Sequence, residues 1–249
     1  MPTPFMHLNA AMRVLPTLEK AGVAPASLPA YLLGHIAPDV TSITGKPRVS
    51  THFISPRDPE LRRLVPHAVM LERCPELWKP FSSEQQSFVM GVLGHLKADE
   101  LWMHRIAVRF FRGIAPEHRH QRRLAHDAFR TRVDIEALEC LEAKVTELLE
   151  QGESKGWYPL ENDEALHEWR DRLLKQMKSG QSLALQVFAK RLKVTEDEFE
   201  TMVFGEEWQE KHVGPLCRRE ELAAYWKETD PAMARVMVEY GEKSAVHHG

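Results

Sequence analysis

A histidine and an aspartate one helical turn apart have the clearest capacity for chemistry in this sequence. His95 and Asp99 lie within the stretch 88–106, which has the apolar period of a helix. The large apolar residues on the same face are Phe88, Val92, Trp102 and Ile106. An ionised carboxylate on such a face needs a partner, because burying it alone is costly. That partner could be a hydrogen-bond donor on another helix, an arginine, or a metal ion that His95 and Asp99 share.

Two glycines precede this pair on the same predicted helix. Gly91 and Gly94 each weaken a helix by up to ~1 kcal/mol relative to alanine. We expect them to be there because they allow another backbone to approach closely.

Helical periodicity predicts an all-α protein, and no stretch of useful length alternates with period two. Prolines, glycines and capping residues place the expected helices at 5–15, 28–36, 60–73 with a break at Pro66, 82–113, 116–151, 163–178, 182–192, 195–204, 215–227 and 231–242. The helix at 195–204 is expected to begin with a capping box of Thr195 and Glu198, and the helix at 231–242 with Asp230 as its cap. Residues 40–60 contain several prolines and no long apolar period, so we expect a functional loop there. We expect one domain over 1–249, in which 135–249 serve as helical scaffold.

The composition describes an ordinary globular chain that is long enough to bury a sizeable core. Hydrophobic residues make up 43% of the 249 residues and charged residues 28%. The net charge of -3 gives no electrostatic argument for a nucleic-acid partner, so we expect none. No apolar run reaches the ~18 residues of a transmembrane helix.

The cysteines and the first residues favour a reducing compartment. The three cysteines are far apart and odd in number, which offers neither a disulfide framework nor a Cys-x-x-Cys zinc site. The first residues lack the basic start and apolar run of a secretory signal. We therefore expect a cytoplasmic location.

Other histidines and aspartates stand at the ends of predicted elements. His7 lies near the start of the first helix, where a partly exposed side chain is the simpler interpretation. Asp39 follows an apolar helix on a turn, where a capping role is the simpler one. His52 precedes a phenylalanine, which indicates an ordered segment that points inward. His126 and Asp134 are eight residues apart, so they can face the same side of a helix.

Taken in order, these candidates resemble the zinc-dependent phospholipase C family, whose members are all-α proteins of about this size. The shared features are the early helical His7, the Gly-x-x-x-Pro-Asp turn at 34–39, the Thr-His pair at 51–52, and His95-x-x-x-Asp99. All of them fall within residues 1–134. The resemblance implies a metal-dependent phosphodiester hydrolase with two or three zinc ions and a phosphate ester or phospholipid as substrate.

The resemblance also implies roles for individual residues. One zinc ion would be surrounded by Asp39, His52, His95 and Asp99. Asp99 would bridge to a neighbouring ion that His7 helps to bind, and Asp39 would also be the candidate general base.

His126 and Asp134 would continue the metal cluster. The family carries a His-x-x-x-Glu pair here, but His126 is followed at that distance by Arg130, so Asp134 is a substitute by position only. His104 is a reserve candidate. Substrate-binding residues and oligomeric state are not readable from the sequence.

Two other hypotheses stay open at this point. His126 and Asp127 could be the doublet of an HD-type metal phosphohydrolase, with His95 as the earlier ligand. Alternatively, the chain could be a helical binding or scaffold protein without turnover, whose polar stripe is held by hydrogen bonds or a stabilising metal. Removing the metal with a chelator would distinguish an enzyme from a scaffold. Loss of a structural metal changes only the melting temperature, whereas loss of a catalytic metal also abolishes activity.

Overall fold

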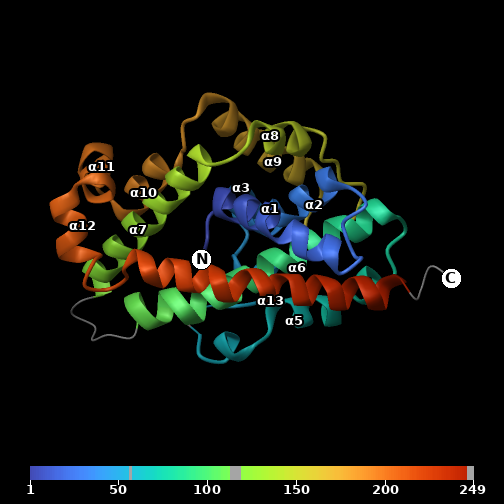
Figure 1. Ribbon diagram of the computed structural model, residues 1–249. Coiled ribbons are helices and arrows are strands. Elements are labelled where there is room, and N and C mark those ends of the chain that lie inside the picture. Colours follow the sequence, from blue (N-terminus) through green and yellow to red (C-terminus); the bar gives the residue numbers. More distant parts are fainter. Residues whose placement is uncertain (56–57, 113–118, 246–249) are drawn as a thin grey trace.

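The structure is a computed structural model that describes residues 1–55, 58–112 and 119–245, and within these ranges it contains helices and no strand. The α-helices are α1 (Pro4–Lys20), α2 (Leu28–Ile36), α3 (Thr41–Thr44), α4 (Val49–His52), α5 (Pro66–Arg73), α6 (Ser83–Trp102), α7 (Arg119–Glu139), α8 (Ala143–Glu150), α9 (Asp163–Ser179), α10 (Ala184–Leu192), α11 (Glu196–Phe204), α12 (Glu206–His212) and α13 (Arg219–Ala245) (Figure 1). Short turns of other helical types are η1 (Ala37–Val40), η2 (Leu61–Arg63), η3 (Pro75–Trp78) and the π-helical η4 (Met103–Arg112). The predicted all-α class is confirmed.

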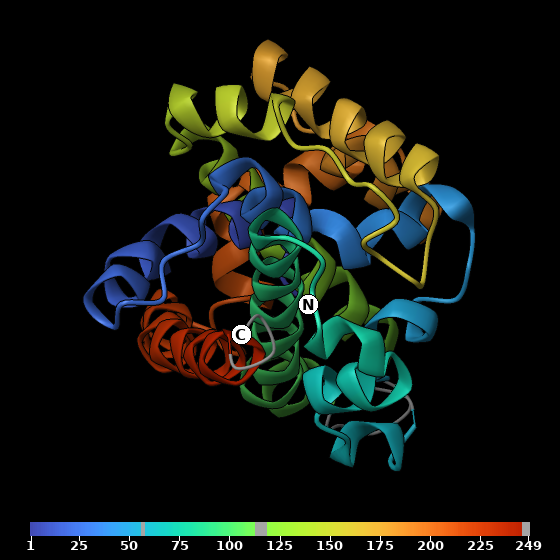
Figure 2. The same cartoon turned by 90° about the vertical axis from the view of Figure 1, so that its right-hand side faces the viewer.

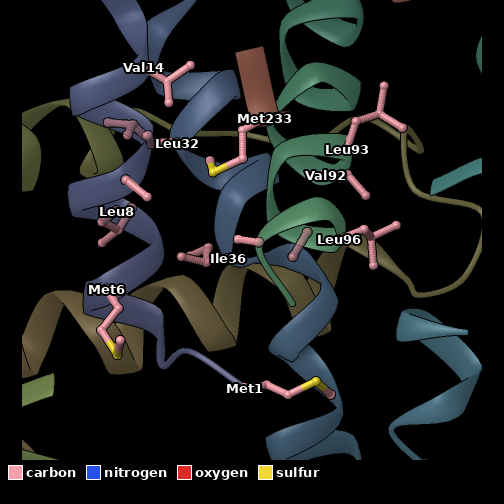
Figure 3. Packing of buried hydrophobic residues seen from close by; sticks show 14 of the residues in the cluster. Met1, Met6, Leu8, Val14, Leu32, Ile36, Val92, Leu93, Leu96 and Met233 are labelled. Carbon is pink, nitrogen blue, oxygen red and sulfur yellow. The ribbon is translucent and has the colours of Figure 1, made fainter. Parts of the chain in front are cut away.

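Helix α6 lies at the centre, and the other helices are arranged around it (Figure 2). Its neighbours α2 and α13 pack along its length, and α1 packs on α2. Between α1, α2 and α6 the core is filled by aliphatic side chains such as Leu8, Leu32, Ile36 and Val92 (Figure 3). One apolar cluster extends from the first residues to α13, and a smaller one joins α7, α10 and α11. The helices form a single domain.

The apolar stripe of α6 is buried as predicted. Phe88, Val92, Trp102 and Ile106 are at most 1% exposed. The expected backbone approach is also present, because a Cβ atom on Gly91 would lie 2.1 Å from the carbonyl oxygen of Tyr31 on α2. Glycine lets the backbones of α2 and α6 touch, and this contact fixes the positions of the residues that follow on both helices.

Two expected helix ends are wrong, both at a proline. Helix α1 continues through Pro16 to Lys20, and α13 continues through Pro231 where we expected two helices. A proline removes one helical hydrogen bond and crowds the preceding turn. Apolar burial continues beyond both prolines, with Leu18 on α1 and Met233 on α13 fully buried, and this burial offsets the loss. Asp230 pairs with Arg13 on α1 at 2.8 Å, where we expected a helix cap.

The expected loop at 40–60 also contains helical turns. Helix α3 is followed by Gly45 and α4 by Phe53, whose positive φ angles of 70° and 57° end the two helices. The resulting short turn α4 carries His52 at its end. Residues 56 and 57 lie outside the described ranges.

Other boundaries differ in smaller ways. The central helix changes to the π-helical η4 after Trp102, and the expected helix 116–151 is divided into α7 and α8. The expected limits at 113 and 116 lie outside the described residues. Helix α12 was not predicted, whereas α2 and the Thr195–Glu198 capping box of α11 match the expectation. In the described part of the chain, no helix is long and apolar enough to cross a membrane.

Candidate metal site

Four elements bring five of the predicted ligands together inside the domain. Helix α1 contributes one histidine, η1 one aspartate, α4 a second histidine, and α6 the His-x-x-x-Asp pair. These residues are His7, Asp39, His52, His95 and Asp99, all between 0% and 3% exposed. The simpler interpretation of His7 as a partly exposed residue is therefore wrong.

Four donor atoms of this cluster, called the four-donor cage below, lie close together around Nε2 of His52. The Nε2 atom of His52 lies 3.3 Å from Oδ1 of Asp39, 3.4 Å from Oδ2 of Asp99 and 3.2 Å from Nε2 of His95. The distance from Nε2 of His95 to Oδ2 of Asp99 is 3.7 Å. Tetrahedral ligands at zinc distances of ~2.0–2.1 Å are separated by about 3.3 Å. The four measured separations are close to this value, so His52 and His95 together with a carboxylate fit such an ion.

The second nitrogen of each histidine is held in a way that turns Nε2 towards the cage. Nδ1 of His95 lies 2.7 Å from the carbonyl oxygen of His35. Nδ1 of His52 lies 2.8 Å from Oγ1 of Thr51, whose hydroxyl donates to the carbonyl oxygen of Pro38 at 2.9 Å. These acceptors require the proton on Nδ1, so each Nε2 presents a lone pair. This is the arrangement that orients metal-binding histidines.

The protonation states of the histidines and aspartates leave acceptor atoms facing one another in the site. Burial lowers the pKa of His52, and burial together with nearby His7 holds the pKa of His95 well below its ordinary value, so both rings are neutral. Burial alone would raise the pKa of Asp39 and Asp99, but the guanidinium of Arg48 and the neighbouring histidines together outweigh burial and lower both pKa values. Two lone pairs and two carboxylate oxygens therefore face one another, which a cation at their centre would stabilise.

Arg48 is a residue of the site that the sequence does not single out. Its Nη1 lies 2.5 Å from Oδ1 of Asp39, and its Nη2 lies 2.6 Å from Oδ2 of Asp99. It stands four residues before His52, at the start of α4, and this spacing would have placed the two side chains on the same side of a helix. The sequence predicts a loop there, and the spacing has this meaning only in a helix.

A second group of polar atoms lies on the other side of Asp99. Nε2 of His7 is 3.5 Å from Oδ1 of Asp99, and neither atom has a hydrogen-bond partner. The ring of His7 stacks on that of His95 with centroids 3.7 Å apart. Within the described residues, His7, His95 and Asp99 form one of two groups that could hold a metal, and the other is Asp39, His52 and His95.

His35 is a further buried histidine near this second group that the sequence analysis did not select. Both of its ring nitrogens are buried without a hydrogen-bond partner. Burial, together with the nearby His7 and His95, holds its pKa well below the ordinary value. Unpartnered buried polar atoms are costly, so they indicate that water or a cation belongs here.

The remaining predicted ligands lie outside both groups. Nε2 of His126 accepts a hydrogen bond from the indole of Trp102 at 3.3 Å. Asp127 binds Arg191 at 2.5 Å, so the proposed HD doublet is engaged with an indole and a guanidinium. Asp134 accepts from Ser182 at 3.3 Å, and burial raises its pKa to about 6. His104 is exposed.

No family model, curated protein or solved structure matches this chain. The resemblance to the zinc-dependent phospholipase C family therefore depends on the residues themselves and on how the structure arranges them.

Proposed function

We propose that this protein is a zinc-dependent phosphodiester hydrolase of phospholipase C type. The observation that carries the proposal is the convergence of acceptor atoms from Asp39, His52, His95 and Asp99, with four measured separations of 3.2–3.7 Å. Imidazole and carboxylate ligands suit zinc. The unpartnered pair of His7 Nε2 and Asp99 Oδ1 supports a second ion, with Asp99 as the bridge.

Zinc would supply Lewis-acid chemistry, by polarising the phosphoryl group and lowering the pKa of a bound water. The residues of the chain position that chemistry. Thr51 and the carbonyl of His35 hold the two imidazoles in the tautomer that can bind the ion. Asp39 is proposed as a ligand and as the proton acceptor. Arg48 helps to keep the pKa of Asp39 low, and a carboxylate with a low pKa is a weak base. The role of Asp39 as a ligand is therefore better supported than its role as proton acceptor.

The substrate in this proposal is a phosphate ester, and no nucleic-acid partner is expected. All three cysteines lie in the described ranges and are unpaired, which supports the proposed cytoplasmic location. A bulk-lipid-degrading activity there would threaten the membranes of the cell itself. We therefore favour a small phosphodiester over membrane phosphatidylcholine.

The test compares two buried aspartates by the same substitution. Asp99→Asn changes the proposed bridging ligand, and Asp127→Asn changes an aspartate that binds an arginine instead. Zinc content by elemental analysis should be one or two ions per chain in the wild type and in Asp127→Asn, and should fall in Asp99→Asn. Hydrolysis of bis(4-nitrophenyl) phosphate should follow zinc content, and phosphatidylcholine vesicles and 4-nitrophenyl phosphate would define the substrate class.

The results would also separate the alternatives. Loss of zinc in Asp127→Asn with retention in Asp99→Asn would favour the HD-type hydrolase. A wild type that binds no zinc after purification and zinc addition would refute the metal site itself.

A second candidate is a metal-stabilised helical protein without turnover. The candidate donors come from residues that are at most 3% exposed, and ligand sets supplied wholly by buried protein groups are typical of structural zinc. In that case a chelator would lower the melting temperature, and no phosphoester tested would be hydrolysed by the zinc-loaded protein.

A further inference from the structure

Arg48 is the exposed member of an otherwise buried cluster. Its side chain is 37% exposed, whereas those of His52 and Asp99 are 0% exposed and that of Asp39 is 5% exposed. The side chain of Arg48 is therefore the part of this cluster that solvent reaches most. Any phosphate ester that approaches the carboxylates from this side contacts Arg48 first.

The guanidinium and a metal ion would draw on the same two oxygen atoms. Arg48 contacts Oδ1 of Asp39 and Oδ2 of Asp99, and both atoms also belong to the four-donor cage. A divalent ion at the centre of the cage would lie within a few ångströms of the guanidinium, where like charges repel strongly. The two cations therefore compete for one pair of carboxylates.

The backbone at Arg48 is fixed, whereas the side chain has few other attachments. Its carbonyl oxygen accepts from the backbone N–H groups of Thr51 at 3.2 Å and His52 at 3.0 Å, which holds the start of α4 in place. The Nε atom of Arg48 is buried without a hydrogen-bond partner, so no third acceptor holds the guanidinium between the carboxylates. Once displaced, the guanidinium would remain tethered at the opening of the site.

We propose that metal loading displaces Arg48 from Asp39 and Asp99, and that Arg48 then binds the phosphate group of the substrate. A guanidinium offers two parallel N–H groups that match two oxygens of a phosphate. This inference rests on the proposed function, since it requires the metal site, and it adds a substrate-binding residue that the sequence did not reveal.

Cobalt(II) is a suitable probe for the test, because its visible absorption reports occupancy and ligand geometry. We would titrate the wild-type chain, Arg48→Gln and Arg48→Lys with cobalt(II), and then add inorganic phosphate to each loaded protein. Arg13→Gln is the matched control, because Arg13 is also ion-paired, with Asp230, and its side chain is 40% exposed. Circular dichroism of the loaded proteins would verify that each variant is folded.

We expect Arg48→Gln to bind cobalt(II) at least about tenfold more tightly than the wild type, since a competing cation is gone. Phosphate should change the spectrum of the wild-type complex and not that of Arg48→Gln. Arg48→Lys, which keeps the charge but cannot bridge both carboxylates, should be intermediate in cobalt affinity. Arg13→Gln should match the wild type in both measurements.

Several outcomes would overturn the proposal. Weaker cobalt binding in Arg48→Gln would show that Arg48 supports the ligands from outside the cage, and an unchanged phosphate response would show that another group binds the anion. In either case the wild type still binds metal, so the proposed function stands. A wild type that takes up no cobalt would instead refute the metal site and this inference with it.

Discussion

Adding one methyl group at Gly91 should separate α2 from α6 and impair the metal site. A Cβ atom at this position would lie 2.1 Å from the carbonyl oxygen of Tyr31 and 2.8 Å from the backbone nitrogen of His35. Both are backbone atoms of α2, so no flexible side chain can move aside. Ordinary contact begins near 3.4 Å, so the helices would have to shift by about 1.3 Å in Gly91→Ala.

The shift has two measurable consequences. Overpacking of this kind costs ~1–3 kcal/mol of unfolding free energy, against up to ~1 kcal/mol gained from the better helix propensity of alanine. Asp39 follows α2 in η1, whereas His95 belongs to α6, so the same shift pulls the four-donor cage apart. Metal sites tolerate changes of only ~0.2 Å in ligand distances. We therefore expect zinc affinity to fall by more than the loss of stability alone would cause.

The matched control is Gly241→Ala on α13. This glycine is also buried in a helix, but a Cβ atom there would meet the side chain of Val23 at an ordinary 3.4 Å. Its substitution should be neutral or should stabilise by up to ~1 kcal/mol. Gly91→Ala should lower the melting temperature of the chelated protein, by ~2–4 °C for each kcal/mol lost.

Scanning calorimetry of both chelated variants and a competitive zinc titration would check this prediction. If Gly91→Ala melts at or above the wild-type temperature, the close approach of the two backbones is not what positions the helices. If it is destabilised but binds zinc as the wild type does, the cage does not depend on the distance between α2 and α6.

Three further predictions follow from single contacts or from the site as a whole. Thr51→Val removes the hydroxyl that holds Nδ1 of His52, so zinc affinity in a competition titration should fall by ~10–100-fold while the helical circular dichroism is unchanged. An equal affinity would show that the carbonyl oxygen of Arg48, 3.1 Å from the same nitrogen, is sufficient. Burial raises the pKa of Asp134 from 3.8 to about 6, so its favourable contribution to stability is complete below about 3.8 and is lost as the pH rises through 6. Asp134→Asn should therefore stabilise the chain by up to ~3 kcal/mol at pH 8 and by little at pH 4, as measured by urea unfolding at both values. The same gain at both pH values would contradict the raised pKa. Chelation of the zinc-loaded wild type should lower its unfolding free energy by ~4 kcal/mol when free zinc is about a thousandfold above the dissociation constant, and calorimetry with and without chelator would detect it.

Local features of the sequence predicted local features of the structure. The spacing of His95 and Asp99 on an apolar stripe gave the buried face of α6, because helix periodicity is set by the backbone alone. The Thr195–Glu198 capping box was predicted for the same reason, since its two hydrogen bonds join residues three apart. The helix boundaries predicted at Pro16 and Pro231 are wrong, because tertiary burial on both sides of each proline outweighs the lost helical hydrogen bond.

The partners within the site could not be predicted in this way. Arg48 reaches Asp99 across 51 residues of chain, and the ring of His95 reaches the carbonyl oxygen of His35 across 60. Such pairs depend on how the helices pack, and the periodicity of the sequence does not specify that packing. The packing also decides which predicted ligands meet, because His7 and His52 lie against Asp99 and His95, whereas His126 lies against the indole of Trp102.

The sequence by itself determined the helical class, the buried face of α6 and the residue types that could bind zinc. The tertiary structure decided which of them meet, and it showed that a guanidinium lies where a metal ion would bind the same carboxylates. The physical reason is that helical periodicity and capping join near neighbours in the chain, whereas a metal site depends on distances between separate helices, which only their packing fixes.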